Sequence, residues 1–388
     1  ILGAKDLLIR ASSVSTYGST PVYNYTAQYL DAGGTVLSYV GTSGVSANPI
    51  NLNSTGSATF VLNDGVGTLT AGFMLVNAGL SSSGNTNAGQ YNVAALPGAI
   101  KTGNSFQNFI IVGTSIVEPL IITTPSLSGA SITKVYDGSA VVSSQVTNLM
   151  SGSSQVIAGD AASLSASGFY SDKNVGTAKL VTISFGINGA DAANYKLAAN
   201  QIQGNYGAIT QLASVTYVGP VGGDWSLASN WAGGAIPDLS NVANVIIPTG
   251  TSVVYGPTVA GPVTSQVQAN GSLNLASAGA GVSLGGISGS GSVALGVNNL
   301  TLTAASGNFS GAISGTGGLT VASGTQTLSG VNTYTGPTAI NTGASLIISG
   351  SGVLGGGSYA GTIANNGSLQ YASSATQTLS GVISGTGN

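Results

Sequence analysis

Charge is the scarcest property of this chain: charged residues make up 4% of its 388 residues, whereas about a quarter is usual. The seven basic residues form no cluster, so nucleic acid is a poor partner, because phosphate neutralisation needs grouped cations. Histidine is absent, which excludes a Ser-His or Cys-His nucleophile. Cysteine is absent too, which fits export of a large protein through an oxidising compartment.

Long apolar runs are also missing. The longest, such as FIIVGTS and EPLIITTP, have the length of a strand, whereas a membrane-spanning helix needs about 18 apolar residues. We therefore expect no membrane insertion. The chain begins ILGAKDLLIR and ends SGVISGTGN in the middle of a pattern, and we interpret it as an internal segment of a longer polypeptide.

What the sequence does contain is 42% hydrophobic residues and 61 glycines, arranged in short alternating runs. Alternation over four to eight residues with Gly, Asn and Pro between the runs is typical of strands, and no stretch keeps a helical period. The sequence predicts an all-β protein with two β-sandwich-like modules followed by a parallel β-solenoid. Composition divides it into segments 1–123, 124–212, 213–259 and 260–388.

The solenoid prediction depends on an internal repeat. Residues 270–291 and 366–387 align without a gap, and 11 of 22 positions are identical. Repeats of this kind favour stacked coils, here of about 20–26 residues, and an offset of 96 would be four coils of 24. We therefore expect Asn270 and Asn366 to occupy the same corner, four rungs apart.

A solenoid also explains the missing charge. The same position stacks on itself about every 4.8 Å, so a repeated charge would face its own kind along the whole column. Ser, Thr and Asn can instead form hydrogen-bonded ladders on the outside. The narrow core would be filled by apolar side chains of the C-terminal half, among them Leu328, Ile340, Leu346 and Ile348.

Few residues remain for catalysis. After Lys196 the only charged residues are Asp224 and Asp238, which could form the carboxylate pair of a glycosidase only if the fold brought them together. Composition does not exclude a Ser-Lys dyad. We prefer turn or cap roles for both aspartates and assign no catalytic residue.

Metal and cofactor sites are equally poorly supported. Asp160, Asp172 and Asp191 are the only acidic group dense enough to consider for Ca²⁺, and their spacing matches no known calcium loop. We interpret them as turn residues and assign no metal-ligating and no cofactor-binding residue. The motif Thr-x-Thr, found at 301–303, 325–327 and 376–378, would suit an ice-binding ladder only if its copies were aligned.

Several runs resemble known surface proteins. Residues 134–138, KVYDG, together with SASGFYSDKNVGT and GADAANYKL, resemble the YDG module of large bacterial exoproteins. The first segment, with SSVSTYGSTPVYNYTAQY and GQYNV, resembles the related, mostly β MBG module. GGDWSLASNWAGGAIPDLSNVANVIIPTG is similar to the opening segment of autotransporter and haemagglutinin-like passengers, and LSGVNTYTGPTAINTGASLII resembles the autotransporter-associated β-strand repeat.

Two details of these runs have a physical reading. Tyr136, Asp137 and Gly138 suit a tight turn in which Asp bonds the backbone and Gly has φ > 0. Trp225 and Trp231 are expected to plug the open end of the solenoid, and stacking on a sugar is the alternative.

The resemblance implies a non-enzymatic segment of a large secreted bacterial surface protein, similar to filamentous-haemagglutinin-like adhesins. Such a segment would be extracellular, at the bacterial cell surface, and would act as a stalk or fibre in attachment or biofilm formation. Its expected partners are host or neighbouring-cell surface glycans or proteins, other copies of itself, and an outer-membrane secretion partner. Two alternatives stay open: a self-assembling extracellular matrix filament and a polysaccharide-active enzyme on a β-helix.

Overall fold

The computed structural model describes most of the chain, namely residues 6–21, 23–30, 36–39, 56–61, 68–97, 100–102, 108–126, 131–142, 146 and 155–388. Apart from the single helical position Val146, the elements within these residues are strands and one-turn 3₁₀ helices, so the fold is all-β, as predicted. Within the same residues, no helix has the length and apolar character that crossing a membrane requires.

The chain forms two compact units, which are described separately. The first contains residues 1–128, 143–168 and 182–203, and the second contains residues 129–142, 169–181 and 204–388. The predicted division into four segments is not tested by this partition. It stays a prediction.

The first module is a sheet with a parallel pair at its centre. β1 (Asp6–Thr16) pairs in parallel with β8 (Asn108–Glu118), the last long strand of the module. Alternate residues of β1, including Leu7 and Ile9, are buried, which is the period of a strand with one face on a core. The full order is β3-β2-β1-β8-β6-β5-β4 with β7 beside β5; the other strands are β2 (Asn24–Leu30), β3 (Val36–Tyr39), β4 (Gly56–Val61), β5 (Thr68–Leu75), β6 (Gly89–Ala95) and β7 (Ile100–Thr102).

The second module repeats this strand order. Its sheet runs β10-β15-β13-β12-β11, which corresponds one for one to the path β1-β8-β6-β5-β4, and its first strand is again parallel to its last. The strands are β10 (Ile132–Val135), β11 (Val141–Val142), β12 (Ser163–Tyr170), β13 (Gly176–Asn188) and β15 (Gln201–Thr210). Because strand pairing does not report how sheets pack face to face, the sandwich-like packing of both modules stays a prediction.

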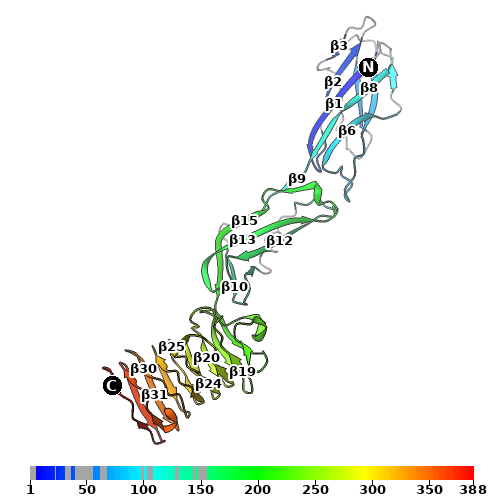
Figure 1. Cartoon of the computed structure of the whole chain (residues 1–388). Helices are drawn as coiled ribbons and strands as arrows, with labels where there is room; N and C mark the ends of the chain where they lie inside the picture. The colour runs from blue at the N-terminus through cyan, green and yellow to red at the C-terminus, as the bar shows by residue number, and fades with distance from the viewer. Residues whose placement is uncertain are drawn as a thin grey trace. The chain divides into compact units, whose positions relative to one another are not determined.

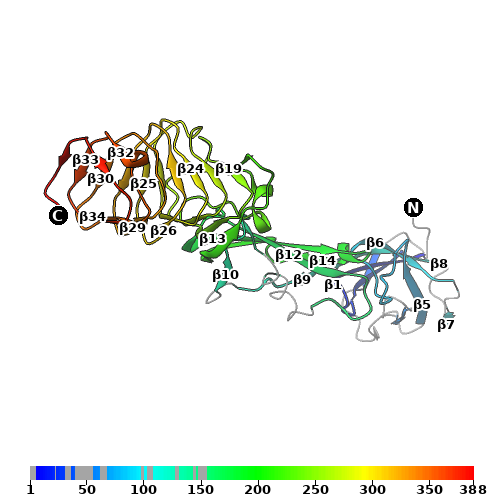
Figure 2. The same ribbon diagram turned by 90° about the horizontal axis from the view of Figure 1, so that it is seen from below.

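The predicted parallel β-solenoid is present (Figures 1 and 2), and its parallel strand pairing begins at Leu212, earlier than the predicted start at 260. Each rung passes three faces in turn. The first face is built from β16 (Leu212–Thr216), β18 (Val242–Ile247), β20 (Gln266–Ala269) and β23 (Gly286–Ser288), and continues through β26 (Asn308–Phe309), β29 (Thr325–Leu328), β31 (Ser345–Gly350) and β34 (Ser368–Ser373).

The other two faces follow the same rule. The second contains β17 (Gly223–Asp224), β19 (Ser252–Val254), β21 (Ser272–Asn274), β24 (Ser292–Ala294) and β27 (Ala312–Ser314), and the pair β32 (Ser358–Tyr359) and β35 (Thr378–Leu379) lies further along the coil. The third contains β22 (Val282–Leu284), β25 (Leu300–Leu302), β28 (Leu319–Val321), β30 (Thr338–Ile340), β33 (Ile363–Asn365) and β36 (Ile383–Ser384).

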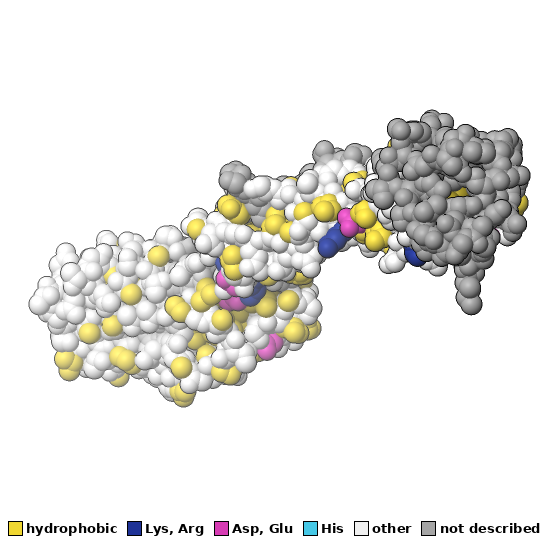
Figure 3. Space-filling model, turned by 90° about the horizontal axis from the view of Figure 1, so that it is seen from above, with side chains coloured by type: hydrophobic (Ala, Val, Ile, Leu, Met, Phe, Trp, Pro, Cys, Tyr) yellow, Lys and Arg dark blue, Asp and Glu magenta, His cyan; other side chains and the backbone are white. Residues whose placement is uncertain are grey.

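The core of the solenoid consists of apolar columns. Leu273, Val293 and Ile313 are paired in register on successive rungs, and all three are fully buried. The four side chains expected to point inward, Leu328, Ile340, Leu346 and Ile348, are buried as predicted. On the outside, Figure 3 shows mostly uncharged side chains with scattered hydrophobic ones over the solenoid, and acidic side chains near its beginning, where Asp224 is exposed.

The prediction that the two repeat copies place Asn270 and Asn366 at the same corner of the solenoid is wrong. Asn270 lies between β20 and β21, at the corner from the first face to the second, whereas Asn366 lies between β33 and β34, at the corner from the third face to the first. Several rungs are shorter than the predicted 24 residues: Val282 pairs with Leu300, 18 positions on, and Leu273 pairs with Val293, 20 positions on. The 96 residues between Asn270 and Asn366 therefore cover four rungs and two further faces. The sequence repeat returns on a different face because the two periods do not match.

Candidate functional site: the module junctions

The first compact unit contains a half-buried carboxylate that links the first two modules. Tyr17 follows β1 directly, and its hydroxyl donates to Asp160 Oδ2 at 2.5 Å. The hydroxyl of Tyr195 donates to the same oxygen, and the Ser83 backbone N–H donates to Asp160 Oδ1 at 3.2 Å. The two tyrosine rings meet edge to face, with centroids 5.4 Å apart, over Val117. Asp160 thus joins groups from both modules.

The hydrogen bonds at this carboxylate determine its protonation. Burial alone would raise the pKa of Asp160, but bonds from Ser83, Tyr17 and Tyr195 lower it to about 2. Hydrogen bonds from the Ala161 backbone and from Ser82 lower the pKa of Asp191, which lies in the same cluster. Both aspartates are therefore ionised at neutral pH and act as acceptors.

The second compact unit contains a matching contact at the start of the solenoid. Tyr136 follows β10, and its hydroxyl lies 2.9 Å from Ile236 O and 3.3 Å from Asp238 Oδ1. Lys173 donates to Asp238 Oδ2 at 2.8 Å and to the Tyr136 hydroxyl at 3.2 Å. Burial would lower the pKa of Lys173, but Asp238 and Tyr136 raise it, so this buried carboxylate keeps a cationic partner.

The Tyr-Asp-Gly turn confirms its expected geometry. Asp137 accepts the Ser139 N–H at 2.9 Å and Lys134 Nζ at 2.7 Å, and Gly138 has φ +78°. Glycine is also required by space, because a Cβ on Gly138 would lie 2.5 Å from Gly234 O of the following segment. The bond from the Tyr136 hydroxyl to the solenoid was not predicted, since no feature of the motif itself points to a partner 102 residues away.

The two tryptophans are buried at the beginning of the solenoid. Trp225 and Trp231 are 0% and 1% exposed, and their rings meet edge to face at 4.9 Å. Trp231 Nε1 donates to Trp225 O at 2.6 Å, and Trp225 Nε1 donates to Pro237 O at 3.0 Å. Neither ring has a free face on which a sugar could stack. Their burial therefore supports the expected role of closing the end of the solenoid.

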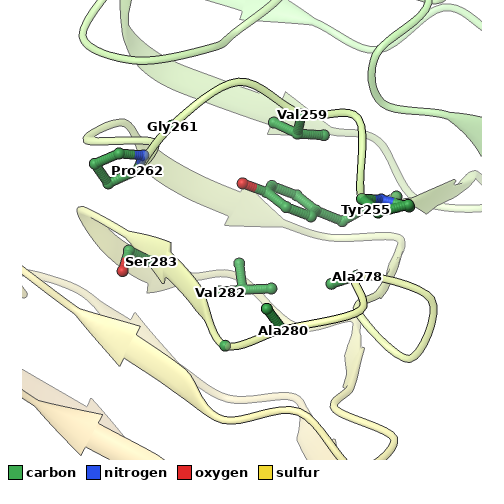
Figure 4. A pocket seen from close by; sticks show the side chains of 11 residues that line it. Tyr255, Val259, Gly261, Pro262, Ala278, Ala280, Val282 and Ser283 are labelled. Carbon is green, nitrogen blue, oxygen red and sulfur yellow. The ribbon is translucent and has the colours of Figure 1, made fainter.

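Next to this plug lies a small pocket of about 360 Å³ (Figure 4). The ring of Tyr255 lies between Val259 and Val282, and Pro262 and Ala278 complete the apolar lining. Burial raises the pKa of Tyr255 to about 12, so its hydroxyl stays neutral at physiological pH. The pocket contains no charged side chain, which leaves it without an acid, a base or a metal ligand.

The remaining candidate residues have separate structural partners. Asp224 accepts the N–H and the hydroxyl of Ser226 in a local turn, while Asp238 bonds Lys173. Asp172 bonds Lys179 Nζ at 2.6 Å. Across the described part of the chain, no three acidic side chains gather as a metal site would require. The Thr-x-Thr motifs fall on β25, β29 and β35 in three different sheets, so they form no common ladder.

Comparison with known proteins gives one match. Residues 123–202 match the family model of the YDG domain, which supports the resemblance drawn from the Tyr-Asp-Gly run. No curated protein and no solved structure matches the chain. The resemblances to MBG, filamentous-haemagglutinin-like and autotransporter proteins stay predictions.

Proposed function

We propose that this chain is a non-enzymatic segment of a large secreted bacterial surface protein, acting as a stalk or fibre that carries contact surfaces away from the cell. The observation that carries the proposal is the construction of the junctions. Successive modules are joined by buried tyrosines bonded to carboxylates, at Asp160 and at Asp238. Such joints suit a protein whose task is to transmit force.

A binding role is favoured over catalysis by the chemistry of the candidate acids. Asp160, Asp224 and Asp238 each accept hydrogen bonds from neighbouring groups that fix turns or junctions. The YDG match also fits a binding or adhesive protein better than an enzyme. An outer surface with few charges would bind host or neighbouring-cell glycans or proteins through neutral hydrogen bonds and scattered apolar side chains.

The test is adhesion of the full chain. Beads coated with the purified chain should resist flow on surfaces bearing glycans or extracellular proteins, and beads coated with an unrelated all-β protein should not. Equal detachment of both bead types from every surface would reject the adhesive role. Electron microscopy of the same material distinguishes the alternative, because regular polymers would favour a matrix filament over a stalk.

A further inference from the structure

The two junctions share a second contact, made by an asparagine in the receiving module. In the first junction the Ala88 N–H donates to Asn194 Oδ1 at 2.7 Å, and Asn194 Nδ2 donates to Asn87 Oδ1 at 2.9 Å. In the second, the Val175 N–H donates to Asn241 Oδ1 at 2.8 Å, and Asn241 Nδ2 donates to Asn174 Oδ1 at 2.9 Å. In both junctions, therefore, a backbone N–H and an asparagine carbonyl of the loop pair with the carbonyl and the amide of one asparagine.

Each asparagine lies in the same local sequence. Asn194 follows Asp191 and Asn241 follows Asp238 in the pattern Asp-x-x-Asn, and each Asn N–H donates to the Asp carbonyl at 3.0 Å. All four side chains are buried. The intervening backbone differs, since Leu239 has φ +50° and residues 192–194 form a 3₁₀ turn, so the shared feature is the placement of the amide.

The loop that docks is also shared. Asn87 and Asn174 each begin the sequence Asn-x-Gly, and the glycine starts the corresponding strands β6 and β13. Because the loop offers a backbone N–H and an asparagine carbonyl, the contact does not depend on the side chain at x, which is Ala in one junction and Val in the other.

The crossing strands complete the equivalence. β8 is followed by β9 (Leu120–Ile122), which pairs in parallel with β14 (Tyr195–Leu197), the strand beginning immediately after Asn194. β15 is followed in the same way by β16, which pairs in parallel with β18, beginning immediately after Asn241. The receiving fold is a sheet module in the first case and a solenoid in the second.

We propose that Asp-x-x-Asn before a strand is a general docking socket, and that Asn-x-Gly at the start of a strand is the matching plug. The partner that the socket recognises is any β module carrying this plug, whatever fold carries the socket. The inference concerns how modules are joined and does not depend on what the chain adheres to.

The test grafts one plug onto the other socket within the full chain. Ala88→Val gives the first loop the Asn-Val-Gly sequence of the second, while leaving Asn194 in place and the buried Thr86 unchanged. Amide hydrogen exchange then reports the docking bond directly, because the N–H at position 88 is its donor. We expect protection at position 88 within about threefold of the parent.

Single substitutions supply the controls. Asn194→Ala should reduce protection at position 88 by on the order of tenfold, in the parent and in the graft, and leave position 175 unchanged; Asn241→Ala should do the reverse. Asn188→Ala removes an exposed asparagine bonded to Ser165 and should change neither amide. Exchange at position 88 of the graft at loop rates, with β6 and β8 still protected, would overturn the proposal.

Discussion

Tyr136 shows at the scale of single residues how a family motif acquires a structural role. Its hydroxyl bonds the solenoid, its ring lies under Lys173 with Nζ 5.7 Å from the centroid, and Gly138 allows the close approach of Gly234. The turn chemistry of the motif was predictable, because Asp and Gly have local preferences. The docking was not, since it depends on a residue in another module.

Removing the Tyr136 hydroxyl tests this role. Tyr136→Phe keeps the ring but leaves Ile236 O and Asp238 with one donor fewer, so we expect the free energy of unfolding to fall by about 1 kcal/mol. Chemical denaturation of the full chain measures it. Tyr371→Phe, which removes an exposed local bond to Ala375 O, is the control and should have a smaller effect. Equal losses would argue against a special junction role.

A substitution at Thr86 should raise the stability of the protein, whereas Tyr136→Phe should lower it. Its side chain is buried, and its hydroxyl is one of two buried side-chain groups without a partner within the described residues. Thr86→Val is nearly isosteric and removes the desolvated hydroxyl, so we expect stability to rise by about 1 kcal/mol. A higher midpoint of thermal unfolding would confirm the effect, and a lower one would show that the hydroxyl is satisfied.

The pH dependence follows from Asp160 and from the tyrosines. The folded pKa of Asp160, about 2, lies below its ordinary value of 3.8, so its stabilisation is complete above the ordinary value and is lost as pH falls toward 2. Burial raises the pKa of Tyr255 from 10.0 to about 12, so its contribution is complete below pH 10 and is lost above it.

Stability should therefore change little between about pH 5 and 9, with a fall on either side. Thermal unfolding across this range checks the prediction, and a midpoint that moved by more than about 10 °C within the window would contradict it.

At the scale of elements, Gln326 illustrates what holds the solenoid rungs together. It is fully buried in β29, and its Nε2 donates to Ile287 O and Gly307 O, both at 3.0 Å. Gln377, in a second copy of the sequence Thr-Gln-Thr-Leu, lies directly before β35, accepts the Leu354 N–H and donates to the Leu354 carbonyl. The glutamine of Thr-Gln-Thr-Leu therefore links neighbouring parts of the coil by side-chain hydrogen bonds in both copies of the sequence, which lie at different sheets.

Gln326→Leu should destabilise the solenoid by about 2 kcal/mol, because Ile287 loses the buried amide that accepts its N–H and donates to its carbonyl. The same change at the more exposed Gln377 should cost less, since water can replace the amide there. Urea unfolding of both variants measures the difference. An equal or larger loss at Gln377 would show that burial does not set the cost.

Strand identity was predictable from alternation, as in β1, where Leu7 and Ile9 are buried while Arg10 is exposed. Parallel stacking was predictable from the internal repeat. The corner assigned to Asn270 and Asn366 was not, because rungs vary in length: Ile340 pairs with Asn365 across 25 positions, around the 3₁₀ turn at Gly355–Gly357. Because the number of residues per rung varies, two residues separated by a fixed number of positions do not always lie on the same face of the solenoid.

At the scale of the whole molecule, the chain repeats one way of connecting unlike folds. In each unit a strand continues into the next module, a buried tyrosine reaches a carboxylate, and an asparagine accepts a loop N–H. The low charge suits this construction, because stacked rungs would place like charges side by side. We infer that the joints are as much a part of the fold as the modules.

Stretching the full chain by its ends in a single-molecule force experiment tests this claim most directly. If the junctions are integral, the parent should show no extension step before its modules unfold, whereas the double variant Tyr136→Phe with Asn241→Ala should show an early step at lower force. A parent chain that already lengthens in low-force steps, indistinguishable from those of the double variant, would contradict the account.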